Sequence, residues 1–421
     1  MAIRTWQAVA IPAAVGAALT LGPLPDGTRF GTAGLSLAAG VAALTLMAAA
    51  ALTGSRWRWV ERIFGGLDRV YAAHKWMGIW ALVLASAHML FKAGTDAWTV
   101  AAILELPPWW TRLLRQAAYV GLVFIVLLAL NRNIPYSTWR WWHKLSGPVF
   151  LVVVLHALSF RSPIALDSPA GLWMAAWSVL GVAGALYKLT LYRFAASHAE
   201  YEVVAVDPGA AAAHIQLAPV AKPVRFVPGQ FGFLRMKQDG LREPHPFTIA
   251  SGSGGDGRAD FVVRGLGDYS SRLVAEVRPG MRAEVYAPYG LFARNTGARQ
   301  EIWIGGGVGI SPFIAWLQDR SASDFDKVTL FYFFTPGREF PPLEIMQGMA
   351  RERGASLVAV SGGPDDPAFV DTFAALCREH GPDALEVAFC GPQGLLARVR
   401  GEMRRNGVPA RNLRHELFEF R

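Results

Sequence analysis

Four histidines in the first 190 residues, His74, His88, His143 and His156, form two widely spaced pairs. His74 and His88 are fourteen residues apart, a rise of about 21 Å along an α-helix after nearly four whole turns, so both lie on one helix face. His143 and His156 are thirteen residues apart, a rise of about 19.5 Å. On two parallel helices, His74 lies level with His143 and His88 with His156. Each pair then offers two imidazoles to the axial positions of a haem iron, so the spacing predicts two stacked b-type haems.

A histidine inside a membrane can instead hydrogen-bond to a neighbouring helix, and for any single one that alternative stands. Four of them, confined to two helices as two pairs, favour metal ligation, because an ionisable side chain is costly in a bilayer. Covalent haem attachment is excluded because no Cys-x-x-Cys-His motif occurs. Thirteen residues rotate His156 by about 140° from His143 on an ideal helix. We expect Gly147 and Pro148, between them, to kink the helix and re-aim His156.

The elements that must carry these histidines are membrane helices. The chain of 421 residues is 52% hydrophobic and only 17% charged, whereas a soluble globular protein has about 25% charged residues. Its first half contains six stretches of about 20 mainly apolar residues, the length that spans a bilayer as a helix. The predicted spans are residues 6–24, 32–53, 71–91, 113–131, 141–160 and 169–190.

The charges indicate how these spans are oriented. Residues 1–190 hold fifteen Lys and Arg against six Asp and Glu, so the net charge of +9 lies entirely in that half. This distribution excludes nucleic-acid binding as the reason for the basic charge and fits the lipid bilayer as the partner. Basic residues concentrate in loops 54–70 and 131–144 and at the end of the sixth span, which the positive-inside rule places in the cytoplasm. The sequence predicts a multi-pass protein of the plasma (inner) membrane whose N-terminus and soluble half are cytoplasmic.

After about residue 195 the pattern changes to short strands punctuated by Gly and Pro, typical of a small antiparallel barrel. Its predicted strands are residues 201–206, 231–236, 261–263 and 283–286. From about residue 299, strands alternate with helices as in a doubly wound α/β domain. Its predicted strands are residues 301–304, 328–334, 356–360 and 387–390. The two cysteines, Cys377 and Cys390, are too few for a disulfide scaffold, a four-cysteine zinc site or a plant-type iron–sulfur cluster.

Three motifs in the second half could bind nucleotides. Glycines after the first α/β strand let backbone N–H groups approach a pyrophosphate at a helix N-terminus, although alone this signal is weak. A strand ending in His-Pro-Phe-Thr places an aromatic ring and a hydroxyl beside a planar ligand, with a surface loop histidine as the alternative for His245. Residues 263–271 offer a second anion site at a helix start. The candidate cofactor-binding residues are Gly305, Gly306, Gly307, Gly309, Ser311 and Pro312, then His245, Pro246, Phe247, Thr248 and Ser251, and finally Arg264, Gly267, Ser270 and Ser271.

Together these residues resemble the NADPH oxidase and ferric reductase superfamily, nearest its bacterial NADPH oxidase-like members, over most of the chain. The resemblance implies a multidomain fold, in which a six-helix transmembrane bis-haem bundle precedes a ferredoxin-NADP reductase-like module. That module comprises an antiparallel β-barrel FAD domain and a doubly wound α/β nucleotide domain. The implied domains are residues 1–194, 195–297 and 298–421.

The resemblance also implies roles for single residues. Cys390, Gly391 and Pro392 resemble the family's nicotinamide-side turn. The terminal segment 415–421 resembles the family's tail, in which an aromatic residue covers the flavin. We favour Phe418 over Phe420 for that role, with packing of both rings into the core as the alternative. The candidate catalytic residues are thus Thr248, Cys390 and Phe418.

The second α/β strand is followed by Arg338. An arginine at that position suits the 2′-phosphate of NADPH, whereas an acid would suit the 2′-hydroxyl of NADH. We therefore expect NADPH to be preferred, with NADH as a possible donor. A solvated loop charge is the alternative for Arg338.

The chemistry requires FAD between NAD(P)H and haem, because a hydride carries two electrons and a haem iron accepts one. The leading hypothesis is electron transfer from cytoplasmic NADPH through FAD and two b-type haems to O2, giving superoxide on the opposite face. The alternative acceptor is a ferric or other metal chelate. Lys92 and Arg161 could attract such an acceptor or pair with haem propionates. A haem carrier without enzyme activity is disfavoured by the nucleotide motifs, and no obligate protein partner is evident.

Overall fold

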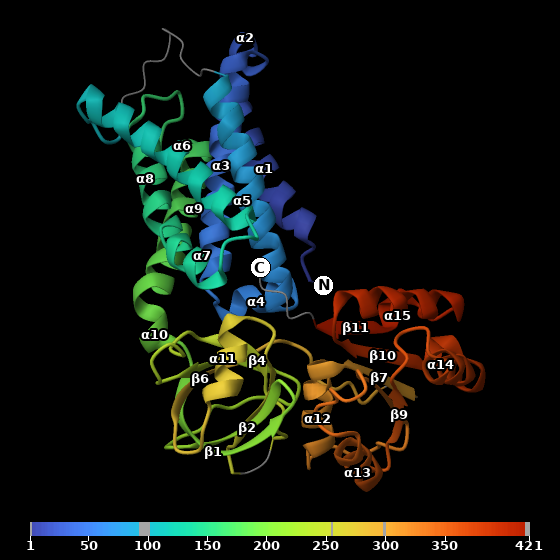
Figure 1. The fold of residues 1–421 in the computed structure, drawn as a ribbon. Helices are drawn as coiled ribbons and strands as arrows, with labels where there is room; N and C mark the ends of the chain where they lie inside the picture. Colours follow the sequence, from blue (N-terminus) through green and yellow to red (C-terminus); the bar gives the residue numbers. More distant parts are fainter. Residues whose placement is uncertain (1, 92–101, 254–255, 298–299, 417–421) are drawn as a thin grey trace. The chain divides into compact units, whose positions relative to one another are not determined.

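The computed structural model (Figure 1) describes residues 2–91, 102–253, 256–297 and 300–416. The chain divides into two compact units after Ala196. The first unit is helical, and the second contains two β-sheets.

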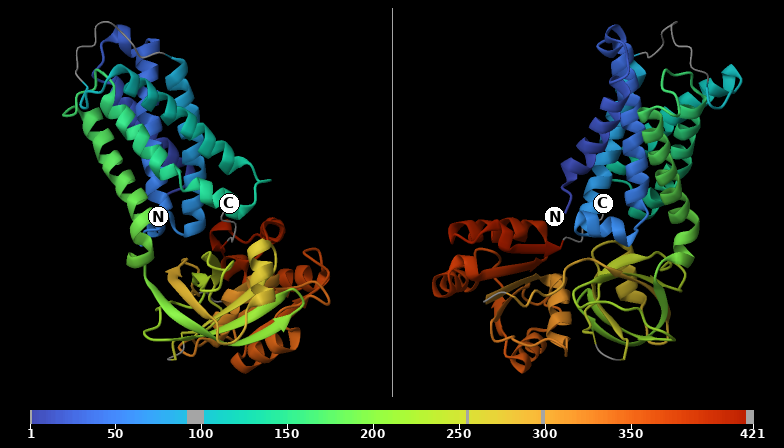
Figure 2. Two further views of the ribbon diagram at one scale, coloured as in Figure 1. Left: turned by 60° about the vertical axis from the view of Figure 1, so that its left-hand side comes forward. Right: turned by 180° about the vertical axis from the view of Figure 1, so that it is seen from behind.

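The helices of the first unit run side by side as a bundle (Figures 1 and 2). They are α1 (Thr5–Leu21), α2 (Asp26–Arg29), α3 (Thr32–Gly54), α4 (Arg58–Phe64), α5 (Leu67–Leu90), α6 (Pro108–Leu130), α7 (Tyr136–His143), α8 (Ser146–Ser159), α9 (Pro169–Leu186), the π-helical turn η1 (Tyr187–Leu191) and α10 (Tyr192–Ala195).

Helices occupy all six ranges predicted to span the membrane, but they differ in length and polarity. Among the described residues, four helices are long and apolar enough to cross a bilayer, at Thr32–Gly54, Pro108–Leu130, Tyr136–Ser159 and Pro169–Ala195. Helix α1 has 17 residues, which is shorter than the roughly 20 that a perpendicular span requires. Helix α5 is long enough, with 24 residues, but it carries two histidines and several charged side chains. Both histidines of α5 fall in the third of the predicted spans.

Helix α3 is the centre of the bundle. In its apolar stretch 72% of the residues are buried, against 28% or fewer in the other three long helices. The sequence explains this position, because α3 is rich in Ala and Gly, whose small side chains let neighbouring helices approach closely. The helix faces α5 along much of its length, and α5 carries His74 and His88.

The fifth span is broken where the sequence predicts a kink. Helix α7 ends at His143 and α8 begins at Ser146, two residues before Pro148. Proline has no N–H to donate to the carbonyl four residues earlier, so the helix cannot continue regularly through Lys144. His143 and His156 therefore lie on two helical segments rather than on one ideal helix.

The first sheet of the second unit is an antiparallel barrel. Its strands are β1 (His198–Gly209), β2 (Ala212–Pro219), β3 (Phe231–Met236), β4 (His245–Thr248), β5 (Ala259–Arg264) and β6 (Arg282–Tyr289), in the order β4-β3-β6-β1-β2-β5. A bridge between Ile249, just after β4, and Phe261 in β5 joins the two edges of the sheet. Alternate residues such as Tyr201 and Val203 point into an apolar core. Helix α11 (Asp268–Glu276) lies between β5 and β6 in sequence.

The second sheet is parallel and doubly wound, as predicted. Its strands are β7 (Gln300–Gly306), β8 (Val328–Phe333), β9 (Ser356–Val360), β10 (Leu385–Cys390) and β11 (Leu413–Glu416), in the order β11-β10-β7-β8-β9. One face packs on α12 (Ser311–Gln318) and α13 (Leu343–Arg353), and the other on α14 (Pro367–His380) and α15 (Gln393–Arg405). Strands β8 and β9 are added on one side of β7, and β10 and β11 on the other, so the strand order switches between β7 and β10. Ligands of such sheets bind at the carboxyl ends of strands at this switch point.

Candidate functional site

The four histidines of the first unit meet in the two predicted pairs. The ring centres of His74 and His143 lie 6.0 Å apart, and those of His88 and His156 lie 6.5 Å apart. A metal–imidazole bond is about 2 Å long and the bonded nitrogen lies about 1 Å from its ring centre, so two imidazoles on opposite sides of one metal have ring centres about 6 Å apart. Both pairs thus have the separation that bis-histidine ligation of one iron requires.

Hydrogen bonds from α3 select the ring nitrogen that is available in one histidine of each pair. His74 Nδ1 lies 2.9 Å from the carbonyl oxygen of Ala50, and His88 Nδ1 lies 2.8 Å from that of Ser36. A carbonyl only accepts, so each Nδ1 carries the proton and donates it. The Nε2 atom of each ring is then unprotonated, which is the form that binds a metal.

Two glycines of α3 make room for these rings. A Cβ atom on Gly40 would lie 2.9 Å from His88 Nδ1, closer than real Cβ contacts come. A Cβ atom on Gly54 would lie 3.6 Å from His74 Cε1, an ordinary contact. The His88 ring is therefore seated directly against the α3 backbone.

The partner histidines are held by aromatic packing. The His143 ring stacks on Trp139, one turn earlier in α7, with ring centres 5.1 Å apart. The His156 ring lies 5.9 Å from that of Phe160. His143 Nδ1 is buried without a hydrogen-bond partner in the described part of the chain. No cluster of three or more His, Cys, Asp or Glu suited to a metal occurs among the described residues, so the histidine pairs are the candidate metal sites there.

The strand predicted to hold a flavin is β4, at the edge of the barrel. Thr248 ends this strand, is 6% exposed and pairs with Phe231 of β3. Phe247 is half-buried, and Pro246 precedes it in β4. The His245 ring stacks on Tyr269 of α11 with ring centres 3.7 Å apart. His245 thus ties β4 to the first turn of α11.

Two of the predicted hydroxyls already take part in hydrogen bonds to nearby backbone groups. The Ser270 hydroxyl accepts hydrogen bonds from the backbone N–H groups of Leu266 and Gly267, at 2.9 and 3.1 Å, and closes the start of α11. The Ser251 hydroxyl donates to the Arg258 carbonyl and accepts from the Asp260 N–H. Both are buried or partly buried parts of the fold. Ser271 is exposed at the first turn of α11.

The glycine turn packs against the end of β10, at the switch point of the parallel sheet. It forms the short helix η2 (Gly307–Ile310), which leads into Ser311 and Pro312 at the start of α12. A Cβ atom on Gly309 would collide with the Cys390 carbonyl, and one on Gly306 would lie 2.9 Å from Pro392 Cδ. Gly307 has φ +56°, which favours glycine. The turn therefore packs directly against the Cys390-Gly391-Pro392 segment, so both could contact the same ligand.

Arg264 and Arg338 converge on the glycine turn from different elements. Arg264, at the end of β5, donates from a terminal nitrogen to the Arg338 carbonyl at 2.6 Å. Its other terminal nitrogen lies 3.7 Å from the position of a Cβ on Gly307. Its Nε is buried without a partner in the described residues. The Arg338 side chain is exposed on the loop after β8. This arrangement could hold the phosphates of a dinucleotide.

Sequence reasoning missed Glu339, which directly follows Arg338. Its side chain is half-buried, and Oε2 is closed to water without a hydrogen-bond partner in the described residues. An acid at this strand end is the group that recognises the ribose 2′-hydroxyl of NADH. The loop after β8 thus carries both a candidate phosphate ligand and a candidate hydroxyl ligand.

A second missed residue is Glu416, which lies opposite Cys390 in the β10–β11 register. A Cβ atom on Gly290 would lie 2.7 Å from Glu416 Oε1 and 2.9 Å from the ring of Phe231. Glu416 therefore lies between Cys390 and the strand β3 that pairs with Thr248. Burial raises the pKa of the Cys390 thiol well above its usual range, and the Glu416 carboxylate raises it further, so the thiol stays protonated at neutral pH. The sequence signal that could have pointed to Glu416 is an acidic residue within the terminal segment 415–421.

Phe418, Phe420 and Lys92 lie outside the described residues.

Comparison with known proteins agrees with both units. Residues 39–192 match the family of ferric reductase like transmembrane components. Methane monooxygenase component C of Methylosinus trichosporium is 29% identical over 147 residues, which cover 34% of this chain and 42% of that protein. A probable cell surface ferric reductase of Aspergillus oryzae is 25% identical over 279 residues, covering 63% of this chain and 34% of that protein. The chain thus spans less than half the length of these two relatives.

The crystal structure of the flavohemoglobin from Malassezia yamatoensis, with bound FAD and haem, is similar over 92% of this chain and 98% of that chain. Its TM-score is 0.50 at 14% identity, so this likeness bears on the fold alone. The chain therefore combines a ferric reductase-like, multi-pass transmembrane domain with a ferredoxin reductase-like flavin and nucleotide module. The predicted order of a helical membrane domain, an antiparallel barrel and a doubly wound sheet is confirmed.

Proposed function

We propose that this protein carries electrons from cytoplasmic NADPH across the membrane to O2, producing superoxide on the opposite face. The chemistry that bound FAD and haem supply is the conversion of a hydride, two electrons at once, into single-electron transfer. The observation that carries the proposal is the pair of ring separations, 6.0 and 6.5 Å, at two levels of one helix bundle. Two imidazole pairs suit two bis-histidine haems and an electron path through the bilayer.

The roles of the histidines follow from their placement. His74 and His143 would hold the haem nearer the cytoplasm, and His88 and His156 the haem nearer the opposite face. The basic loops after α3 and before α7 support this orientation under the positive-inside rule. The two histidine pairs would hold the haems, and the haems would supply single-electron transfer toward the acceptor.

The reductase roles are assigned within the second unit. Phe247 and Thr248 would hold the flavin ring, with Gly267 and the start of α11 near its phosphates. The glycine turn, Arg264 and Arg338 would hold NADPH, with its nicotinamide beside Cys390, Gly391 and Pro392. Phe418 would cover the flavin until NADPH displaces it. The neutral Cys390 thiol and Glu416 would border the face on which the hydride is transferred.

A second candidate acceptor is a ferric chelate. It is favoured by the family match of residues 39–192 and by the Aspergillus oryzae relative, which is named a cell surface ferric reductase. The electron path would be the same, so only the last step differs.

The test uses the full-length protein in lipid nanodiscs, supplied with FAD and NADPH. We expect NADPH to reduce the haem absorption bands, and the accompanying reduction of cytochrome c to be abolished by superoxide dismutase. A flux that requires ferric citrate and ignores superoxide dismutase would select the ferric chelate instead. Haem bands that dithionite reduces but NADPH does not would contradict the whole path.

A further inference from the structure

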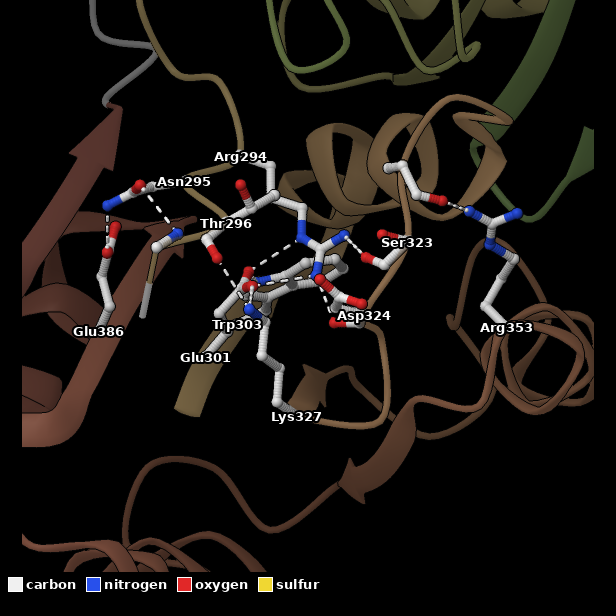
Figure 3. A network of polar contacts seen from close by, with 12 residues as sticks. Arg294, Asn295, Thr296, Glu301, Trp303, Ser323, Asp324, Lys327, Arg353 and Glu386 are labelled. Carbon is white, nitrogen blue, oxygen red and sulfur yellow. Dashed lines mark hydrogen bonds and ion pairs between the residues drawn. The ribbon is translucent and has the colours of Figure 1, made fainter. Parts of the chain in front are cut away.

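The segment that joins the barrel to the parallel sheet, residues 290–297, is anchored by one buried ion pair (Figure 3). Arg294 donates from Nε and from a terminal nitrogen to the two carboxylate oxygens of Glu301, both at 3.0 Å. It also donates to the carbonyls of Ser323 and Asp324, each at 2.7 Å. The side chains of Arg294 and Glu301 are only 6% and 4% exposed. Four hydrogen bonds therefore hold the guanidinium in a site almost closed to water.

Aromatic rings enclose the pair. The Arg294 guanidinium lies 4.1 Å from the centre of the Phe325 ring, and that of Arg353 lies 4.3 Å from it. Trp303 Nε1 donates to Glu301 at 3.1 Å. A buried ion pair seldom stabilises a fold more than apolar side chains of equal volume, because both charges lose their hydration. Its directional hydrogen bonds do fix one geometry.

The joining segment is tied to the strands that end at the candidate site. The Ala293 carbonyl accepts from Arg414 of β11 at 2.6 Å. The Asn295 side chain donates to Glu386 of β10 at 2.5 Å (Figure 3). Strands β10 and β11 end at Cys390 and Glu416. Both neighbours of Arg294 in the chain therefore attach to the strands that border the site.

On the barrel side, Phe292 occupies the contact between the two sheets. Its ring packs on Trp316 of α12 with ring centres 5.0 Å apart. Trp316 Nε1 in turn donates to the Pro228 carbonyl of the barrel at 3.0 Å. A Cβ atom on Gly229 would collide with the Phe292 carbonyl. Since α12 begins where the glycine turn ends, the position of Phe292 links the barrel to that turn.

We propose that Arg294 and Glu301 are a positioning pair that sets the distance between the nicotinamide and the flavin ring for hydride transfer. The inference rests on the proposed function, because it needs FAD on the barrel and NADPH at the glycine turn. Neither residue belongs to the segments assigned to FAD or NADPH: Glu301 lies four residues before Gly305, about 13 Å along β7. The pair acts through the backbone of residues 290–297, which it holds against β7.

The experiment measures flavin reduction by NADPH in the full-length protein, anaerobically and at saturating NADPH, by stopped flow. R294K keeps the charge but loses the bidentate fork, and E301Q keeps the shape but loses the charge. The matched control is R411M, which breaks the Arg411–Asp383 pair whose side chains are 77% and 82% exposed. We expect flavin reduction in R294K and E301Q to slow by on the order of ten- to a hundredfold, as a displacement of about 1 Å would cause. FAD content, haem content and NADP+ affinity should stay within about twofold of R411M.

A purely structural role predicts another result, a lower unfolding temperature with flavin reduction as fast as in R411M, and this would overturn the proposal. Where a single variant loses its FAD, R294M/E301M is measured in its place, because replacing both charges of a buried pair by apolar side chains of similar volume is often neutral or stabilising. Slow hydride transfer in that folded double variant supports the pair, and a wild-type rate overturns it. Failure of the proposed function is distinguishable, because then the wild type itself does not reduce its flavin with NADPH.

Discussion

His88 Nδ1 lies 2.8 Å from the Ser36 carbonyl oxygen, and fourteen residues further along α3 the Ala50 carbonyl makes the same contact with His74 at 2.9 Å. The repeat on α3 equals the spacing of the two histidines on α5, because antiparallel helices packed along their length rise equally per residue. One helix therefore orients one ligand of each pair. The proton on each Nδ1 leaves Nε2 as the nitrogen that can bind a metal.

The first prediction concerns haem content. We expect two haems per chain in the wild type, both low-spin because two imidazoles are strong axial ligands. His88→Ala and His156→Ala should each lower the ratio to one while NADPH still reduces the flavin, because neither residue belongs to the second unit. The pyridine haemochrome assay and stopped-flow flavin absorbance measure the two quantities. A wild-type ratio near one would contradict two sites.

The second prediction uses the two glycines of α3 as a matched pair. Gly40→Ala places a Cβ atom 2.9 Å from His88 Nδ1, so the ring must move, whereas Gly54→Ala adds an ordinary 3.6 Å contact beside His74. We expect Gly40→Ala to lose the His88/His156 haem and Gly54→Ala to keep both. Helix propensity favours alanine at both positions, so a folding defect does not explain a difference. Equal haem content in the two variants would show that a Cβ atom at position 40 fits beside the His88 ring.

The sequence predicts the histidine pairs well because a helix converts spacing into position. The same holds for the glycine turn and Cys390, which both end strands at the switch point of a parallel sheet. The strands 231–236 and 356–360 match β3 and β9 to the residue. In each case the sequence pattern is local, and the regular geometry of a helix or strand determines where its residues lie.

The features that sequence reasoning missed depend on tertiary packing, on strand pairing or on local hydrogen bonds to the backbone. Arg294 and Glu301 are close in sequence, but the rings that enclose them belong to Phe325, which precedes β8, and to Trp303 of β7. Glu416 acquires its place only when β11 pairs with β10. The hydroxyls of Ser251 and Ser270 are engaged by neighbouring backbone groups, which residue type alone does not reveal.

The third prediction concerns the terminal segment. Phe418→Ala should tighten NADPH binding several-fold, because an aromatic stack of about 1 kcal/mol no longer competes with the nicotinamide. Turnover should slow through retention of NADP+. Titration of the oxidised protein with NADP+ gives the affinity, and Phe420→Ala is the control. Tightening in Phe420→Ala instead would assign the lid to Phe420, and a lower unfolding temperature with unchanged affinity would place Phe418 in the core.

The fourth prediction concerns pH and the barrel. Burial of His214 favours its neutral form, but the carboxylates of Asp260 and Asp207 outweigh burial and raise its pKa above the ordinary value of 6.5. The folded state therefore binds this proton more tightly than the unfolded chain does. The resulting stability is complete below about pH 6.5 and is lost as the pH rises through the raised pKa. His214→Gln should lower the unfolding midpoint of the second unit more at pH 5.5 than at pH 8.5. The midpoint is measured from the rise in flavin fluorescence as heating releases FAD. An equal effect of His214→Gln at both pH values would contradict the raised pKa of His214.

The fifth prediction concerns the choice of nucleotide. The Arg338 carbonyl holds Arg264 through its backbone, so Arg338→Ala removes the side chain without removing that contact. A hydrogen-bonded pair between a guanidinium and a phosphate contributes about 1.5 to 3 kcal/mol, so kcat/KM for NADPH should fall by at least about tenfold, while that for NADH stays the same. The control is Arg404→Ala, an exposed arginine of α15 in the same sheet domain. Glu339→Gln separates the opposite possibility, because an acid that binds the ribose 2′-hydroxyl would make the wild type prefer NADH. A wild-type preference for NADH that disappears in Glu339→Gln, with no effect of Arg338→Ala, would assign the specificity to Glu339.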